Sequence, residues 1–253
     1  MTTLNFRIAP IKIFIGLTIF ITILLILNFL TIYFTLTIED LRRIHRFTIR
    51  EFNFNLEGNI PAFFSAVQLL VTSLIIFVIA FAEKSLNQQY LGWMGLALVF
   101  SFLAIDEAVM IHETLIGYFK DTYDLSGYFY YAWVIPYAIG VLVLFLVYIP
   151  FFLRLDLRMF GLMILAGFIF VSGAIGFEML GGNEMENRGW TLTYMIYYSI
   201  EEFLEMIGVS IFVYSLLWFI SVHYGKATFE FDNEHSNDVK NRKSRTVKDA
   251  FFP

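Results

Sequence analysis

Seven acidic residues and one histidine lie in or beside stretches of sequence that are otherwise apolar. They fall in three segments, AIDEAVMIHE, GAIGFEMLGG and SIEEFLEMIG, none of which contains a lysine or an arginine. The residues are Asp106, Glu107, His112, Glu113, Glu178, Glu201, Glu202 and Glu205. One carboxylate at the centre of a membrane costs at least about 2.5–3.5 kcal/mol. We therefore expect these acids to be protonated, hydrated in a cavity or neutralised by bound cations.

Carboxylates combined with a single imidazole form an oxygen-rich ligand set, which suits iron, manganese, magnesium or calcium. Dinuclear centres in helical bundles are likewise rich in glutamate and poor in histidine. Glu205 pairs best with Glu201 or Glu202, because residues three or four apart share a helix face, and Glu178 would join them. The set predicts a metal-binding site for one or two divalent ions, with iron, manganese or zinc as the candidates.

Spacing limits what the segment AIDEAVMIHE can contribute to such a site. Glu107 and His112 are five residues apart and project to well-separated faces of a straight helix. Asp106 and Glu113 share a face but are about 10 Å apart along the helix axis. One ion therefore cannot bind all four from a straight helix, and we expect Glu113 or His112 to be the ligand that completes the set.

The composition is typical of a membrane protein and excludes several other classes. Of 253 residues, 58% are hydrophobic and 15% are charged, with a mean hydropathy of +0.71, whereas soluble chains carry about 25% charged residues. The absence of cysteine excludes disulfide frameworks, thiolate zinc sites and iron–sulfur clusters. A formal net charge of -5 without a basic cluster argues against a nucleic-acid partner.

Six apolar runs are long enough to cross a bilayer, which takes about 20 residues of helix. We predict an all-α polytopic membrane protein, a six-helix transmembrane bundle over residues 1–222 embedded in the lipid bilayer. The expected spans are 11–37, 60–82, 90–112, 128–153, 159–180 and 190–222. The arginine-rich segment Leu41–Phe52 is expected to form a short amphipathic helix on the membrane surface, and the polar residues 223–253 a flexible cytoplasmic tail.

The basic residues indicate the direction of the chain. Eleven lysines and arginines fall in the N-terminus, alternate loops and the tail, and six fall in the other loops, which favours cytoplasmic termini. The third and fifth spans then end, and the sixth begins, in the non-cytoplasmic half of the membrane. The acids of all three therefore reach the same depth, with Lys120 and Arg188 as the basic residues nearest to them.

Other polar and aromatic residues are expected at that depth. Asn28 and Thr31 share one face of the first span, and Gln68 and Thr72 share one face of the second. Aromatic residues at the ends of the spans should form an interfacial belt. The expected belt comprises Tyr128, Tyr130, Tyr131, Trp133, Trp190, Tyr194 and Tyr197.

The segments AIDEAVMIHE and SIEEFLEMIGVSIFVYSLL resemble a group of uncharacterised bacterial multi-pass membrane proteins. Those proteins carry a Leu-Asp-Glu…His-Glu segment and a later Glu-Glu…Leu-Glu-Met-Leu-Gly segment. The resemblance implies a multi-pass protein of a cell membrane, the inner membrane in bacteria, and no particular activity. It also implies a shared site made of Asp106, Glu107, His112, Glu113, Glu201, Glu202, Glu205 and Gly208.

Three functions are open to such a protein. The leading hypothesis is a metal-dependent membrane enzyme that acts on a lipid or another hydrophobic small molecule. The first alternative is a proton- or cation-coupled transporter, which would need a polar stripe continuing through the inner halves of the helices. The second is a non-catalytic membrane subunit, whose acids would hydrogen-bond across the bundle to groups such as Tyr194, Gln68 and Asn28.

Overall fold

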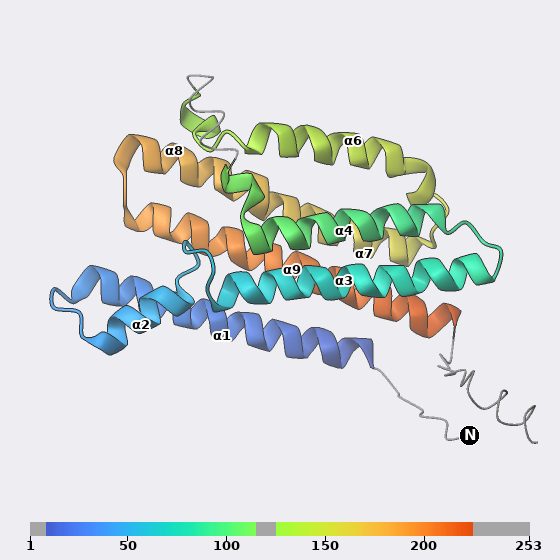
Figure 1. Cartoon of the computed structure of the whole chain (residues 1–253), viewed down its shortest axis with the longest axis horizontal. Coiled ribbons are helices and arrows are strands. Elements are labelled where there is room, and N and C mark those ends of the chain that lie inside the picture. The colour runs from blue at the N-terminus through green and yellow to red at the C-terminus, as the bar shows by residue number, and fades with distance from the viewer. Residues whose placement is uncertain (1–8, 115–124, 225–253) are drawn as a thin grey trace, which may run out of the picture. The chain divides into compact units, whose positions relative to one another are not determined.

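The computed structural model describes residues 9–114 and 125–224, and its helical bundle is built from Ala9–His223 (Figure 1). Every regular element in the described residues is a helix, and six helical runs are long and apolar enough to cross a membrane. They are α1 (Pro10–Thr37), α3 (Ile60–Ser85), α4 (Leu91–Val109), α6 (Val134–Phe152), the run Leu157–Arg188 and α9 (Leu192–His223). The predicted all-α, six-helix transmembrane fold is confirmed.

The fifth span is not a uniform α-helix. It consists of α7 (Leu157–Val171), the π-helical stretch η2 (Ser172–Phe177) and α8 (Glu178–Arg188). It continues past residue 180, the predicted end, because Gly181 and Gly182 pack against tyrosine rings instead of interrupting the helix. It ends at Gly189, whose φ of +71° lies in the left-handed region that glycine tolerates.

Successive spans run in opposite directions, so the ends of α1, α4 and α8 meet the starts of α3, α6 and α9 (left in Figure 1). A cavity lies between the helices at this end of the bundle, which we therefore call the cavity end. A short helix, α2 (Arg43–Phe52), lies there beside α1 and close to the start of α3, in the segment where the sequence predicts a surface helix. The chain then turns into α3 through a loop, residues 53–59.

The third span is shorter than the sequence predicts. α4 ends at Val109, whereas the prediction extends the helix to His112. Met110 adopts the left-handed conformation, with φ 57° and ψ 48°, which is unfavourable for a residue with a Cβ and ends the α-helix. The segment that contains Asp106 and His112 is therefore broken rather than straight.

The fourth span begins later than predicted. α6 starts at Val134 and not at residue 128, because the preceding residues form the 3₁₀ turn η1 (Gly127–Phe129) and a further bend. The predicted tail lies outside the described residues from residue 225 onward, and so does Lys120.

α9 is the central helix of the bundle. Half of its most apolar stretch (50%) is buried, against 11% for α6, and it contacts α1, α3, α7, η2 and α8. A Cβ atom on Gly208 would lie 2.8 Å from the backbone nitrogen of Phe170, and one on Gly173 would lie 2.7 Å from the carbonyl oxygen of Glu201. Glycine at these two positions therefore lets α9 approach the fifth span closely.

Hydrogen bonds between helices link buried polar residues of the bundle. Asn28 on α1 donates to the hydroxyl of Ser199 on α9 at 2.7 Å. Gln68 on α3 donates to the hydroxyl of Ser210 at 2.7 Å and to the carbonyl oxygen of Met206 at 3.1 Å, both on α9. These bonds fix the position of α9 relative to α1 and α3.

Candidate functional site

A cavity of about 190 Å³ lies at the cavity end, and all eight residues that the sequence singles out line it. The acids and the histidine come from four places: Asp106 and Glu107 from α4, His112 and Glu113 from the segment after it, Glu178 from α8, and Glu201, Glu202 and Glu205 from α9. Glu57, in the loop between α2 and α3, lines the same cavity. The structure thus joins the three acidic segments and adds one acid that was not predicted from the sequence.

Hydrogen bonds hold the loop that carries Glu57. Oδ1 of Asn28 accepts the backbone N–H of Phe54 at 2.9 Å, and the hydroxyl of Tyr194 donates to Oδ1 of Asn55 at 2.6 Å. Glu57 gave little signal in the sequence because it lies outside the apolar runs. The asparagines around it, in NFNLEGN, are the signal that could have indicated an ordered loop.

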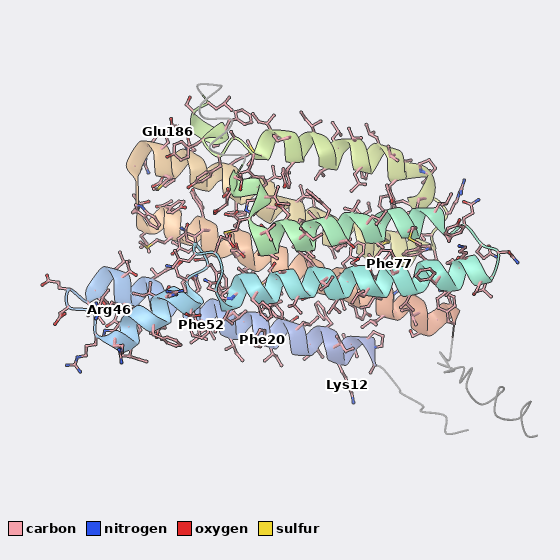
Figure 2. The ribbon with its side chains drawn as sticks, viewed as in Figure 1. Lys12, Phe20, Arg46, Phe52, Phe77 and Glu186 are labelled. Atoms are coloured by element: carbon pink, nitrogen blue, oxygen red, sulfur yellow. The ribbon has the colours of Figure 1, made fainter. Side chains whose placement is uncertain are left out.

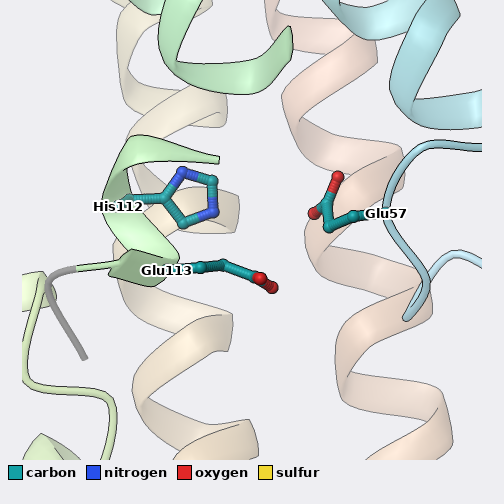
Figure 3. A group of neighbouring side chains, drawn as sticks. All are labelled: Glu57, His112 and Glu113. Atoms are coloured by element: carbon teal, nitrogen blue, oxygen red, sulfur yellow. The ribbon is translucent and has the colours of Figure 1, made fainter. Parts of the chain in front are cut away.

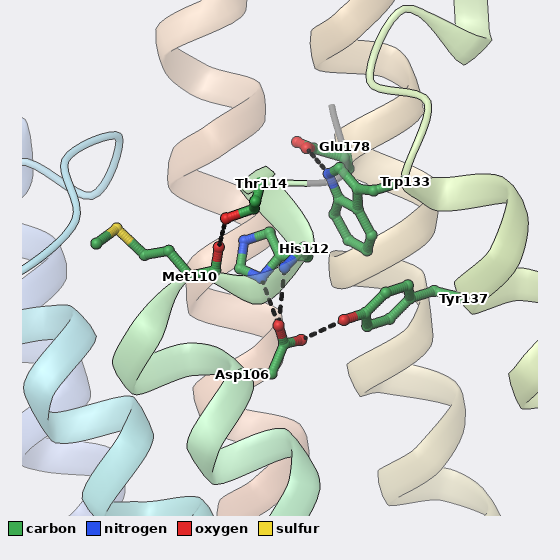
Figure 4. A network of polar contacts seen from close by, with 7 residues as sticks. All are labelled: Asp106, Met110, His112, Thr114, Trp133, Tyr137 and Glu178. Carbon is green, nitrogen blue, oxygen red and sulfur yellow. Dashed lines mark hydrogen bonds and ion pairs between the residues drawn. The ribbon is translucent and has the colours of Figure 1, made fainter. Parts of the chain in front are cut away.

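Asp106 fixes the position of His112 (Figure 4). Oδ1 of Asp106 accepts the backbone N–H of His112 at 2.9 Å and lies 3.3 Å from the ring Nδ1, while Oδ2 accepts the hydroxyl of Tyr137 at 2.8 Å. The break at Met110 makes this contact possible, because an α-helix directs the N–H six residues ahead away from the carboxylate. Nε2 is then the ring nitrogen that is left for a ligand.

Glu57, His112 and Glu113 form a compact cluster of ligating side chains (Figure 3). One ligand atom from each lies within 4.8 Å of the other two. Ligands on opposite sides of one ion are about 4.2 Å apart at usual metal–ligand distances, so the cluster is close to the size of a single-ion site. Oε2 of Glu57 is buried without a hydrogen-bond partner among the described residues, so it is free to accept a bond from a water, a proton or a cation.

Glu178 directly follows the π-helical stretch η2. A π-turn adds one residue to an α-helical turn and rotates the next part of the helix by about 100°, and such turns are frequent at functional sites. Nε1–H of Trp133 donates to Oε1 of Glu178 at 2.9 Å, and the carboxyl groups of Glu178 and Glu201 are hydrogen-bonded to each other. Two carboxyl groups in contact share a proton or a cation.

The three acids of α9 face acids on other helices. Among charged groups, Glu107 on α4 acts most strongly on Glu202 and on Glu205. Glu178 on α8 acts most strongly on Glu201. The acids of α9 therefore connect the α4 side of the cavity to the α8 side.

Basic side chains do not balance these acids. The described residues that line the cavity include eight acids, one histidine and no lysine or arginine. Arg188 pairs instead with Glu184 on its own helix, at 3.5 Å. The acids of the cavity must therefore be protonated, hydrated in the cavity or neutralised by bound cations.

Three cavity residues outside the spans have pKa values shifted by burial and by their neighbours. Burial raises the pKa of the Glu57 carboxyl, and the nearby His112 reverses only part of that effect. Burial lowers the pKa of His112, but the hydrogen bond and charge of Asp106 and the charge of Glu107 raise it by more, so the net shift is upward. Burial raises the pKa of Tyr131 to about 12, which keeps its hydroxyl protonated.

Four buried polar residues of α1 and α3 bond to helices or to the loop that carries Glu57, whereas Ser65 of α3 hydrogen-bonds to the cavity acid Glu107. Thr31 and Thr72 donate to carbonyl oxygens of their own helices, at 2.8 Å and 2.7 Å. Asn28 and Gln68 bond to α9, and none of these four described residues lines the cavity. The bonds from Asn28 and Gln68 to the acids that the packing hypothesis requires are absent from the described residues.

Part of the predicted aromatic belt lies inside the protein. Trp133 and Tyr194 are only 7% and 6% exposed and line the cavity, whereas Tyr128 and Trp190 are 52% and 59% exposed. The hydroxyl of Tyr131 lies 3.2 Å from that of Tyr194. The depth of a residue along a span predicted which aromatic residues lie near the end of the bundle. It did not predict which of them are exposed, because depth does not indicate which face of the helix a side chain occupies.

A family model, the domain of unknown function DUF8692, matches residues 17–219. The match includes every residue that lines the cavity, from Phe54 to Glu205. No curated protein and no solved structure matches the chain.

Proposed function

The chain belongs to the family defined by the domain of unknown function DUF8692, and we propose that its cavity binds one or two divalent metal ions. The observation that carries this proposal is the charge of the cavity wall, with eight carboxyl groups, one imidazole and no lysine or arginine among the described lining residues. Two divalent ions would supply four positive charges, and protons shared between carboxyl groups would balance the rest.

The cluster in Figure 3 supports one ion site. Glu57, His112 and Glu113 would be its ligands, with His112 binding through Nε2. Asp106, a ligand in the sequence-based prediction, would act as a positioning residue, because His112 and Tyr137 engage both of its oxygens. A carboxylate that orients a ligating histidine is a common outer-shell partner of metal sites.

The remaining acids support a second ion site. Glu178 and Glu201 are in contact across two helices, Glu205 lies one turn after Glu201 on α9, and Glu107 and Glu202 face each other beside them. Seven carboxyl groups with one imidazole nitrogen favour manganese or iron, whereas structural zinc sites rely on nitrogen and sulfur ligands.

The apolar part of the cavity wall supports a hydrophobic substrate. Leu69, Leu103 and Phe170 line the cavity together with the acids, and the bundle is surrounded by lipid. A bound divalent ion would polarise a substrate oxygen or lower the pKa of a bound water. We therefore propose a metal-dependent enzyme acting on a lipid or another hydrophobic molecule, with the cavity on the non-cytoplasmic side of a bacterial inner membrane.

The contacts beyond the cavity favour metal binding over ion transport. A transport path would continue from the cavity along the other half of the bundle. There the hydroxyl of Ser73 donates to the carbonyl oxygen of Ala97 at 2.9 Å, and that of Ser215 donates to Phe212 at 2.7 Å. These hydroxyls are used in helix contacts and do not extend the acidic lining.

Elemental analysis of the purified protein tests the proposal. Wild type reconstituted with manganese, ferrous iron or zinc is expected to retain one or two equivalents of one of these metals. The double variant Glu202→Ala and Glu205→Ala is expected to retain no metal at the second ion site. Glu39→Gln with Asp40→Asn, two exposed acids outside the cavity, is the matched control and should bind metal as wild type does.

Gel filtration and thermal unfolding of each variant show whether it is folded. Wild type without stoichiometric metal would refute the proposal. A folded double variant that keeps the full wild-type metal content would refute the assignment of the α9 acids.

A further inference from the structure

α2 presents a row of exposed arginines at the cavity end. Arg43, Arg46 and Arg50 lie within about 60° of one another around the helix, at 100° per residue, and all three are exposed. We call them the arginine strip. Figure 2 shows Arg46 at the opposite end of the bundle from Lys12.

The opposite face of α2 packs on the bundle, which fixes the direction of the strip. The ring of His45 lies 4.7 Å from that of Phe34 on α1, and Phe52 packs against the buried core around Ile21 and Met206. The strip consequently faces away from the bundle.

Two large apolar side chains lie beside the strip and are exposed. Ile44 is 62% exposed and Phe47 is 55% exposed. Arginines next to exposed Ile and Phe are typical of helices that lie in the plane of a membrane interface. Because this helix joins two membrane spans, a bilayer surface is within its reach.

Acidic side chains neutralise the strip only slightly. Glu51 lies 3.6 Å from Arg50, and with the Arg50 side chain 83% exposed this pair contributes little. No ion pair of the described residues involves Arg43 or Arg46. Guanidinium groups bind phosphate oxygens through two parallel hydrogen bonds, so the strip offers three phosphate-binding side chains.

We propose that the arginine strip binds the phosphate groups of anionic phospholipids, with Ile44 and Phe47 inserted at the level of the headgroups. A free phosphate ion would use the arginines alone and would leave the two apolar side chains in water, which is why the lipid is the occupant. The proposal does not depend on metal binding in the cavity.

Quenching by brominated lipids tests this in the full-length protein reconstituted in vesicles. Phe47→Trp places a fluorophore beside the strip, and the same protein without this change gives the background from its four native tryptophans. Brominated phosphatidylglycerol is expected to quench Trp at this position with an apparent affinity about fivefold higher than that of brominated phosphatidylcholine. One arginine near an anionic membrane surface contributes about 1 kcal/mol, which corresponds to about fivefold in affinity.

The arginine dependence is tested by Arg43→Gln, Arg46→Gln and Arg50→Gln together, which should bring the ratio of the two lipids to about one. Lys12→Gln, Lys84→Gln and Arg154→Gln make the same change in net charge at the other end of the bundle and should leave the ratio unchanged. Inorganic phosphate should not reduce the preference at matched ionic strength.

A ratio near one in the Phe47→Trp protein, or a full preference when the three arginines are also replaced, would overturn the proposal. Loss of the preference on adding inorganic phosphate would assign the strip to the free ion. Because the arginines are exposed and hold no core contact, far-UV circular dichroism of the triple variant should match wild type.

Discussion

The first half of α9 carries Glu201, Glu202 and Glu205, whereas the second half carries Ser210 and Ser215 among buried apolar residues. The two hydroxyls of the second half donate to carbonyl oxygens one turn back, at 3.0 Å and 2.7 Å. The three acids of the first half face acids on other helices. The buried hydroxyls of the second half are thus satisfied by backbone groups, whereas the three acids of the first half have no lysine or arginine beside them among the described residues that line the cavity.

Within α9, this difference distinguishes the polar residues that stabilise helix packing from those that are available to bind a ligand. A hydrogen bond between helices in a membrane contributes about 0.6 kcal/mol on average, whereas each charged carboxyl costs at least about 2.5–3.5 kcal/mol near the membrane centre. Packing therefore accounts for residues such as Gln68 and Asn28. It does not account for the six acids that line one cavity from within the membrane spans.

The largest effect is expected when the first half of α9 loses its charges. Glu201→Gln, Glu202→Gln and Glu205→Gln together keep side-chain size and hydrogen bonding, so the protein should fold, with higher thermal stability in the absence of metal because the cost of burying ionisable carboxyl groups is removed. Metal at the second ion site should be lost completely, as measured by elemental analysis. A triple variant that folds and binds metal like wild type would show that these acids serve packing alone.

In the second half, the largest effect is expected at a glycine. Gly208→Leu places side-chain atoms where a Cβ already lies 2.8 Å from the Phe170 nitrogen, so we expect a loss of up to about 3 kcal/mol in free energy of unfolding. Unfolding in mixed detergent micelles measures this. Gly167→Ala, where a Cβ meets nothing within 4 Å, is the control, and equal stabilities for the two variants would contradict the close helix contact.

A smaller change in metal affinity is expected when the positioning residue is altered. Asp106→Asn weakens the contact to Nδ1 of His112 but leaves the proposed ligands in place, so metal affinity should fall about 10- to 100-fold and not vanish. Titration with manganese or ferrous iron measures the change. If affinity is unchanged, Asp106 does not orient the histidine, and if binding is abolished, Asp106 is itself a ligand.

The smallest effect is expected for a packing residue. Gln68→Leu removes two hydrogen bonds to α9, and it also removes Oε1, which is buried without a partner among the described residues. The two effects oppose each other, so the free energy of unfolding should change by less than about 1 kcal/mol. Metal content should equal that of wild type, and a loss of metal would extend the site to α3.

The sequence predicted those features that depend on hydrophobic runs and on depth in the membrane. Runs of apolar residues imply helices in a bilayer because backbone groups must be satisfied within each span. Antiparallel succession of the spans then brings the ends of the third and fifth to the level of the start of the sixth, as the shared cavity of Asp106, Glu178 and Glu201 illustrates.

Features that depend on local backbone geometry could not be predicted in this way. The left-handed Met110 allows Asp106 to contact His112, and a regular helix of the same sequence would keep them apart. Glu57 enters the cavity through tertiary contacts of its loop, including the one from Asn28, 26 residues before Phe54. Hydrophobic periodicity carries no information about either.

The π-helical stretch η2 has a consequence for which residue of α8 reaches the cavity. An α-helix closes its hydrogen bonds over four residues and a π-turn over five, so the stretch Ser172–Phe177 holds one residue more than an α-helix of the same rise. Deleting one residue there would shift the register of the whole of α8 and turn Glu178 by about 100° around the axis. The single extra residue therefore sets the rotation of α8 about its axis, and with it which side chains of α8 face the cavity.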